Sequence, residues 1–176
     1  SADVISKPDI IKNPGRLLNY GTIIKQEINR LNKQVEKVLQ IARIEKSGFE
    51  LKLESIHLNN VIAGIVEHCR ANNNQREAVF TTRLDENVDE IFADRLHLTN
   101  IFHNLIDNAV KYAGDKPEIS LSTKKQQNLI VVKVSDNGPG IGKEFQKKVF
   151  HKFFRVPTGN VHNVKGFGLG LYYVRS

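Results

Sequence analysis

A long helix with an apolar seam is the feature that most restricts how this chain can fold. Between residues 20 and 46, apolar side chains recur at alternating steps of four and three residues, which is the repeat of a coiled coil or helical bundle. A helix with two apolar faces needs several neighbours, so the sequence predicts dimerisation through this region. An amphipathic helix lying on its own domain is the alternative. The seam is Ile24, Ile28, Leu31, Val35, Val38 and Ala42, and Ile23, Leu39, Ile41 and Ile44 widen it.

The segments on either side of this helix predict an α+β fold. Pro8, Pro14 and Gly15 indicate a helix end or a hairpin within residues 1–19. Because strands and helices mix without strict βαβ alternation, we expect a two-layer α/β sandwich in which a mixed sheet carries helices on one face. Strands are expected at 51–54, 78–84, 89–92, 118–123 and 129–135, helices at 58–73 and 94–112, and a short helix followed by a polar loop at 143–165.

The amino-acid composition excludes several classes of protein. The 176 residues are 40% apolar, enough for a real core, and the single cysteine, Cys69, excludes a disulfide framework and a cysteine-based zinc site. No apolar run approaches the roughly 20 residues that cross a bilayer. The formal charge of +7 fits a polyphosphate, an acidic partner or a nucleic acid. The basic residues are scattered and do not alternate with aromatic ones, so no nucleic-acid partner is expected.

One helix carries an unusual polar stripe. Within 94–112, Asn100, Asn104, Asn108 and Lys111 follow spacings of four, four and three and share one face. Asparagine is a poor helix former, and a local cost of this kind often marks a functional site. The amides and the lysine suit Mg²⁺ and phosphate oxygens, and Tyr112 offers a flat face to a base or sugar. A polar face that only contacts solvent is the alternative.

Two glycine-rich segments complete the set of candidate residues. Asp136–Gly142 follows an apolar strand, and an ionised Asp136 would accept a hydrogen bond from an exocyclic amine such as that of adenine; a plain turn is the alternative. Gly166–Leu171 exposes backbone N–H groups where a helix begins, which favours an anion. No strand precedes it, so a dinucleotide fingerprint is excluded. Between these segments, Arg155 follows a cluster of aromatics and could reach a γ-phosphate; an ordinary surface arginine is the alternative.

These stretches together resemble the four boxes of the ATP-binding domain of sensor histidine kinases of two-component systems. His103–Tyr112 resembles the N box, Asp136–Gly142 the first glycine box, Phe150–Arg155 the box of aromatics and Gly166–Leu171 the second glycine box. The helix that ends near residue 45 is similar to the second helix of the family's dimerisation and phosphotransfer domain, and residues 154–168 look most like the Bacteroidetes type. The resemblance implies a Bergerat-type ATP-binding fold preceded by a long bundle helix.

The resemblance also implies roles for individual residues, with ATP and Mg²⁺ as cofactors. Asn104 would bind Mg²⁺, Asp136 would accept from the adenine amine, and Arg155 would be catalytic. Residues 143–165 would form a lid over the ATP. The implied ATP-binding residues are Asn104, Asp107, Asn108, Lys111, Tyr112, Asp136, Gly138, Gly140, Ile141, Lys165, Gly166, Phe167, Gly168, Leu169, Gly170 and Leu171.

The implied function is transfer of the ATP γ-phosphate to a histidine, for relay to an aspartate of a response regulator. None of the six histidines stands in the family's acceptor context, so residues 1–46 would be a partial dimerisation region without the acceptor. Residues 47–176 would be a catalytic domain that stops before the family's last two strands. The partners would be a second copy and a receiver domain, and the chain would be the cytoplasmic portion of an inner-membrane sensor kinase. The alternatives are an ATPase of the gyrase, chaperone or mismatch-repair class, and a structural coiled-coil dimer with a vestigial nucleotide site.

Overall fold

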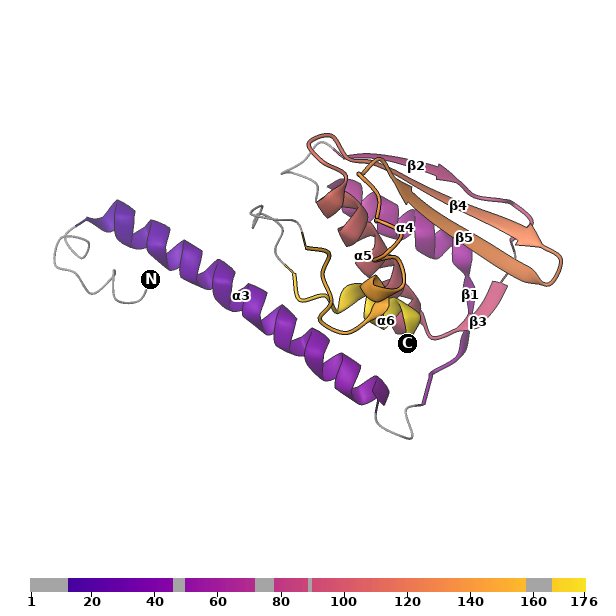
Figure 1. The fold of residues 1–176 in the computed structure, drawn as a ribbon, viewed down its shortest axis with the longest axis horizontal. Coiled ribbons are helices and arrows are strands. Elements are labelled where there is room, and N and C mark those ends of the chain that lie inside the picture. Colours follow the sequence, from indigo (N-terminus) through magenta and orange to yellow (C-terminus); the bar gives the residue numbers. More distant parts are fainter. Residues whose placement is uncertain (1–12, 46–49, 72–77, 89, 158–165) are drawn as a thin grey trace. The chain divides into compact units, whose positions relative to one another are not determined.

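The computed structural model describes residues 13–45, 50–71, 78–88, 90–157 and 166–176 (Figure 1). The chain divides into two compact units, Ser1–Phe49 and Glu50–Ser176. In the part of the chain that the structure describes, the first unit contains helix α3 (Pro14–Glu45) and the second holds two sheets and the other helices. Among the described residues, no helix combines the length and the apolar character that crossing a bilayer requires.

The first unit contains helix α3, Pro14–Glu45. The prediction of a helix end or hairpin is wrong for residues 14–19, because the helix already begins at Pro14. Proline is favoured at the first helical position, and the side chain of Asn13 caps this turn by accepting from the backbone N–H of Arg16 at 3.1 Å. The seam residues are on the surface, with Leu31 53% and Val35 57% exposed. Such a seam fits the predicted dimer, which stays a prediction.

Two sheets form in the second unit. The larger one has the order β2-β4-β5, with β2 (Val79–Arg83) parallel to β4 (Glu118–Gln126) and β4 antiparallel to β5 (Leu129–Asp136), which confirms the predicted mixed sheet. Strands β1 (Glu54–His57) and β3 (Glu90–Ala93) pair with each other in a separate antiparallel sheet. The expected strand at 51–54 was therefore misplaced: Leu51 and Leu53 are exposed, and Ile56 is the residue that β1 buries.

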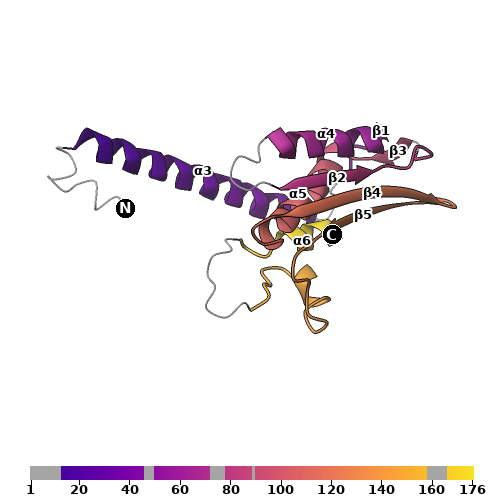
Figure 2. The same cartoon turned by 90° about the horizontal axis from the view of Figure 1, so that it is seen from above.

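The core lies between one face of the larger sheet and two helices (Figure 2). Helix α4 (Leu58–Ala71) and helix α5 (Arg95–Tyr112) both pack on it. In β4 the buried side chains are Ile119, Leu121 and Thr123, every second residue, so a single face of the strand is covered. The sequence predicts that Leu98, Ile101, Leu105 and Ala109 share the buried face of α5. Ala109 is buried as predicted, but Leu98, Ile101 and Leu105 are only half-buried. The other fully buried residues are Phe102 and Ile106, because α4 and the sheet both pack on this helix.

Short elements end the chain. A 3₁₀ turn, η1, covers Lys148–Phe150, and helix α6 covers Gly170–Arg175 and packs against α5. The predicted helix start within 166–171 is thus confirmed. Before the periodic stretch 95–112, the sequence predicts Asp94 as the helix N-cap. This is confirmed, since the side chain of Asp94 accepts from the backbone N–H of His97 at 3.1 Å at the start of α5.

Leu121 gives a direct test of the core. Its side chain is 1% exposed, so Leu121→Ala should lower the free energy of unfolding of the second unit by roughly 2–5 kcal/mol through lost burial and the cavity left behind. Urea unfolding followed by circular dichroism measures this change. Leu129→Ala is the matched control, because Leu129 is 70% exposed and should change stability by no more than about 0.5 kcal/mol. Equal effects of the two substitutions would contradict this core.

Asp94 should make stability depend on acid pH. Its carboxylate accepts from the backbone N–H groups of His97 and of Lys52, and these bonds, the one from His97 first, hold the pKa of Asp94 below its usual value. A carboxyl whose pKa is lower in the folded than in the unfolded protein stabilises the fold fully at a pH above its pKa in the unfolded protein. This stabilisation is lost as the pH falls through the pKa of the folded protein, here below about pH 4. Asp94→Asn keeps a capping amide but does not titrate.

The melting temperature of wild type should therefore fall more steeply below about pH 4 than that of Asp94→Asn. Asp85, whose pKa is lowered by hydrogen bonds from the backbone of Lys125 and from Asn87, keeps part of the acid dependence in both proteins. Asp115→Asn, on the exposed turn after α5, is the control. Parallel curves for wild type and Asp94→Asn would show that Asp94 does not carry this dependence.

Candidate functional site

The polar stripe of α5 is held in a defined orientation. Asn100, Asn104, Asn108 and Lys111 are all half-buried. The side-chain Nδ2 of Asn104 donates to the carbonyl of Asn100 at 2.9 Å. This bond orients the Asn104 amide so that Oδ1 points away from that carbonyl. The oxygen is the atom of this side chain that a hard cation prefers.

The second glycine segment runs along this stripe. A Cβ added at Gly170 would stand 3.1 Å from Oδ1 of Asn104, and one added at Gly166 would stand 2.6 Å from Nζ of Lys111. Since Asn104 and Lys111 are seven residues apart, about two helical turns, residues 166–170 follow α5 in the antiparallel direction. Leu169 is buried, so only its backbone is available to a ligand, whereas Phe167 is exposed and Leu171 is half-buried.

Gly168 fixes the path of this segment. It has φ of +69°, and an added Cβ would stand 2.4 Å from the carbonyl oxygen of Phe154. The backbone N–H of Phe153 donates to the carbonyl of Gly168 at 3.0 Å. Only glycine combines this backbone conformation with so close an approach. The box of aromatics is therefore joined to the second glycine segment by backbone contact.

The first glycine segment meets the last turn of the same helix. A Cβ added at Gly138 would stand 2.9 Å from the carbonyl oxygen of Tyr112. The backbone N–H of Gly138 donates to Oδ1 of Asp136 at 2.8 Å. Asn137 fastens the turn to the chain after α5, because its side chain donates to the carbonyl of Lys116 and accepts from the backbone N–H of Glu118, both at 3.0 Å.

Both glycine segments thus reach consecutive residues of α5: Gly166 contacts Lys111, and Gly138 contacts Tyr112. Tyr112 is 43% exposed and lies 5.4 Å, measured to the ring centroid, from Nζ of Lys111. Asp136, Gly140 and Ile141 are exposed beside this turn. The arrangement brings an aromatic ring, a cation, amide oxygens and a carboxylate to the C-terminal half of α5 and the turn beside it.

Three predicted site residues are not placed among the contacts above. Lys165 falls outside the described residues. Asp107 is exposed and lies toward α4, where its charge adds to the effect of burial, the larger one, in raising the pKa of the Cys69 thiol. Arg155 is exposed and directly follows Phe154, the residue that Gly168 approaches.

Sequence reasoning missed two residues, His97 and Tyr173. The hydroxyl of Tyr173 lies 2.6 Å from Nδ1 of His97, and the two rings stack at 5.9 Å between centroids. The signal was available, because His97 precedes Asn100 by three residues and shares its face of the helix. It is hidden because Tyr173 comes only two residues after the glycine segment, where its spacing is that of an ordinary helix residue.

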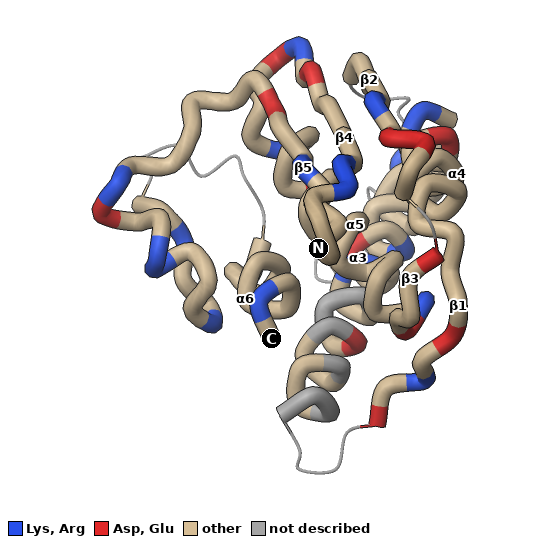
Figure 3. The backbone as a smooth tube through the Cα atoms, turned by 90° about the vertical axis from the view of Figure 1, so that its right-hand side faces the viewer, with Lys and Arg blue, Asp and Glu red and all other residues tan. Residues whose placement is uncertain are grey.

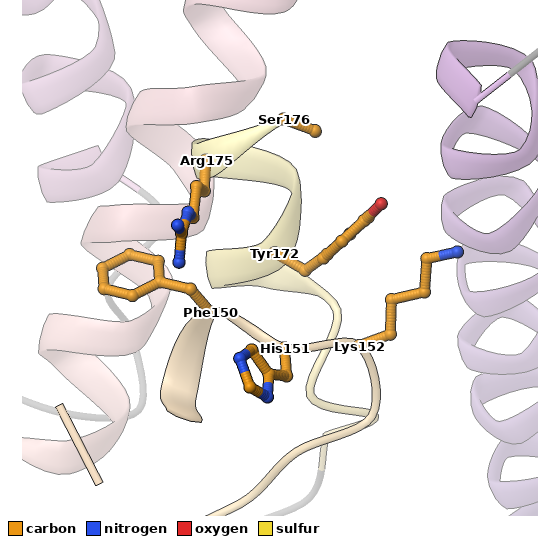
Figure 4. A pocket seen from close by; sticks show the side chains of 6 residues that line it. All are labelled: Phe150, His151, Lys152, Tyr172, Arg175 and Ser176. Carbon is orange, nitrogen blue, oxygen red and sulfur yellow. The ribbon is translucent and has the colours of Figure 1, made fainter. Parts of the chain in front are cut away.

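A surface pocket is formed by residues at η1 and α6 (Figure 4). It is lined by Phe150, His151, Lys152, Tyr172, Arg175 and Ser176. Nζ of Lys152 lies 5.2 Å from the ring centroid of Tyr172, and Arg175 lies 5.9 Å from that of Phe150. The lining holds neither an asparagine nor an acidic side chain, so it lacks the oxygen ligands that Mg²⁺ prefers. We therefore assign the candidate site to α5.

Comparison with known proteins shows a similarity to one class of ATPases. Residues 93–176 match the family of histidine kinase-, DNA gyrase B- and HSP90-like ATPases. This segment contains α5, both glycine segments and α6. The second unit is thus similar to the ATPase domains of that class, and among its branches the chain most resembles the sensor histidine kinases.

One curated relative supports this resemblance. Sensor protein RprX of Bacteroides fragilis (strain YCH46) is 39% identical over 177 residues, which are 99% of this chain and 34% of RprX. The chain thus spans about a third of the length of this curated relative. The Bacteroides source agrees with the Bacteroidetes type that the sequence predicted.

Solved structures confirm the fold. Full-length ShkA in complex with AMPPNP has a TM-score of 0.78 at 23% identity, covering 90% of this chain and 32% of ShkA. The catalytic domain of histidine kinase ThkA has a TM-score of 0.62 at 25% identity, covering 71% of this chain and 78% of that domain. ThkA has also been solved in complex with the response regulator protein TrrA.

Gly168 should be indispensable to the site. Gly168→Ala should weaken binding of an ATP analogue at least about tenfold, because the added Cβ displaces the Phe154 backbone and with it the second glycine segment. Isothermal calorimetry measures the affinity. The control is Gly64→Ala, which enters α4 where nothing lies within 4 Å and should raise stability by about 0.5–1 kcal/mol without changing affinity. Unchanged affinity of Gly168→Ala would contradict the path described for this segment.

Proposed function

We propose that this chain is the ATP-binding catalytic region of a sensor histidine kinase, which transfers the ATP γ-phosphate to a histidine outside the chain. The observation that carries the proposal is the meeting of both glycine segments at the last turn of α5, beside Asn108 and Lys111. An adenine nucleotide needs a base site and a phosphate site a few ångströms apart. Asp136 at one end of this surface and the amide stripe at the other would supply them.

The described residues fit ATP and Mg²⁺ by their chemistry. Oδ1 of Asn104 is oriented by the bond from Nδ2 to Asn100, and we assign it as the Mg²⁺ ligand. Asn108 and Lys111 would hold phosphate oxygens, and Tyr112 would lie against the adenosine. The carboxylate of Asp136 can accept from an exocyclic amine, with Gly140 leaving room for the ring.

Charge on the neighbouring segment favours a polyphosphate. Figure 3 shows Lys and Arg outnumbering Asp and Glu between β5 and α6. In residues 143–155 a single acid, Glu144, accompanies five basic residues: Lys143, Lys147, Lys148, Lys152 and Arg155. Such an excess raises the local concentration of an anionic ligand. Arg155 would act on the γ-phosphate from this segment, which we propose as the lid over the ATP.

Catalysis would consist of positioning and electrostatic stabilisation of an in-line attack by a histidine nitrogen. The residues of the stripe would fix the γ-phosphate, and Lys111 and Arg155 would balance its charge. The proposed lid, residues 143–165, would exclude water; residues 158–165 lie outside the described residues. Mg²⁺, when bound, supplies further neutralisation of the phosphate oxygens.

The related ATPases are the second candidate. Gyrase-like and chaperone-like members hydrolyse ATP with a glutamate on the N-box helix that activates water. Asp107 is the only acidic residue within 103–112, so this stretch holds no glutamate that could activate water. The absence of that glutamate favours the kinase over hydrolysis.

The partners follow from the same proposal. The exposed seam of α3 would pair with a second copy in a helical bundle, and the phosphorylated histidine would pass its phosphate to a receiver domain, as the complex of ThkA with TrrA suggests. Residues 1–46 would be part of the dimerisation domain and residues 47–176 the catalytic domain. Membrane attachment, at the inner membrane, would come through other segments of the parent protein.

Two substitutions test the nucleotide site. Asn104→Ala removes the proposed metal ligand and should weaken Mg²⁺-dependent binding of AMPPNP by about tenfold or more. Asp136→Asn replaces an acceptor by a side chain that can also donate, and should reduce the preference for adenine over guanine nucleotides. Calorimetry with and without Mg²⁺ measures both. Asn128→Ala, on the exposed turn between β4 and β5, is the control. An Asn104→Ala protein that binds like wild type would refute the assigned metal ligand.

The missing acceptor makes a second prediction. Incubated with labelled ATP, the chain alone should stay unlabelled, and a separate peptide with the family's acceptor helix should become labelled when added to it. Labelling of the chain by itself would contradict the statement that its histidines are not acceptors.

A further inference from the structure

A histidine and a tyrosine join the two ends of the candidate site. His97 lies in the first turn of α5 and Tyr173 in α6. The tyrosine hydroxyl is 2.6 Å from Nδ1 of His97, and the ring planes differ by 15°. Tyr173 is 6% exposed, so this contact is shielded from water, and a buried hydroxyl needs such a partner.

The contact continues into the amide stripe. The side chain of Asn100 also hydrogen-bonds to Tyr173, and its carbonyl accepts from Nδ2 of Asn104. Burial raises the pKa of Tyr173, and the bond from Asn100 opposes that effect only in part, so the phenol keeps its proton at neutral pH. With Asn100 donating to the phenol oxygen, the hydroxyl proton can donate to Nδ1 of His97.

We propose that His97 and Tyr173 are positioning residues for nucleotide binding: they hold Asn100 and α6 so that Asn104 and Gly170 keep their mutual placement. The inference rests on the proposed function and adds two residues to it that touch neither phosphate nor metal. A chain of contacts runs from His97 through Tyr173 and Asn100 to Asn104, whose Oδ1 would be 3.1 Å from a Cβ at Gly170. Loss of the hydroxyl frees the Asn100 side chain and lets this geometry relax.

A purely structural role makes a different prediction. If Tyr173 only filled space beside α5, Tyr173→Phe would keep its ring and its packing, and affinity would not change. If ring stacking were the important contact, His97→Phe would preserve it. His97→Asn separates the hydrogen bond from ring stacking. It removes the ring, but its side-chain amide oxygen lies close to the position of Nδ1 and can accept from the Tyr173 hydroxyl.

The experiment compares four variants with wild type: Tyr173→Phe, His97→Phe, His97→Asn and the control Tyr172→Phe. Tyr172 is the preceding residue of α6, and Nζ of Lys152 lies 5.2 Å from its ring centroid. Calorimetry with Mg²⁺ and AMPPNP, well below the melting temperature, measures affinity, and thermal unfolding is recorded for each protein. We expect Tyr173→Phe and His97→Phe to weaken binding about tenfold, the equivalent of one hydrogen bond. His97→Asn should recover most of the affinity, and Tyr172→Phe should match wild type.

A second readout does not require nucleotide. In the unliganded chain, the side-chain amide resonances of Asn100 and Asn104 should shift in Tyr173→Phe and stay in place in Tyr172→Phe. If wild type binds AMPPNP and both Tyr173→Phe and His97→Phe bind it equally well, this inference is overturned and the proposed function stays intact. Failure of wild type itself to bind AMPPNP would overturn both.

Discussion

The rest of the site depends on how α5 is held. Its buried residues Phe102 and Ile106 fix it against the sheet and α4, and the opposite ends of its polar stripe are engaged by segments distant in the sequence. Gly138 lies against the carbonyl of Tyr112, and Gly170 lies against the amide of Asn104. Without this packing, the asparagines would be only an unfavourable helical face in water. With it, they become one wall of a binding surface.

The two glycine segments contribute backbone rather than side chains to the rest of the binding surface. At Gly138 and Gly168 an added Cβ would overlap backbone atoms, and no rotamer change can move those away. Gly138 thus approaches α5, and Gly168 approaches Phe154, more closely than any other residue type allows. Buried Leu169 anchors the second segment. Rigidity of this kind lowers the entropy lost when a nucleotide binds.

Much of the molecule could be predicted from its sequence. The hairpin β4–β5, the cap at Asp94 and the helix from 95 to 112 follow from strong local patterns, and four motifs in the right order indicate the family even though each is weak. Local patterns failed where long-range packing decides. Leu51 and Leu53 alternate like a strand, but the pairing of Ile56 with Ile91 places β1 further along the chain. Pro14 was read as a helix end, although it opens α3. The contact of His97 with Tyr173 joins residues 76 positions apart, and no local spacing reveals it.

The central claim is that the asparagine stripe of α5 and the carboxylate of Asp136 bind the same nucleotide. A nuclear magnetic resonance titration with AMPPNP, with Mn²⁺ replacing Mg²⁺, tests it most directly, since the paramagnetic ion broadens nearby resonances. We predict the strongest broadening at the Asn104 side chain, with weaker but concurrent changes at Gly138, Gly140 and Gly168. Changes confined to the pocket around Phe150 and Arg175, or changes at Asn104 with none at Gly138 and Gly140, would contradict it.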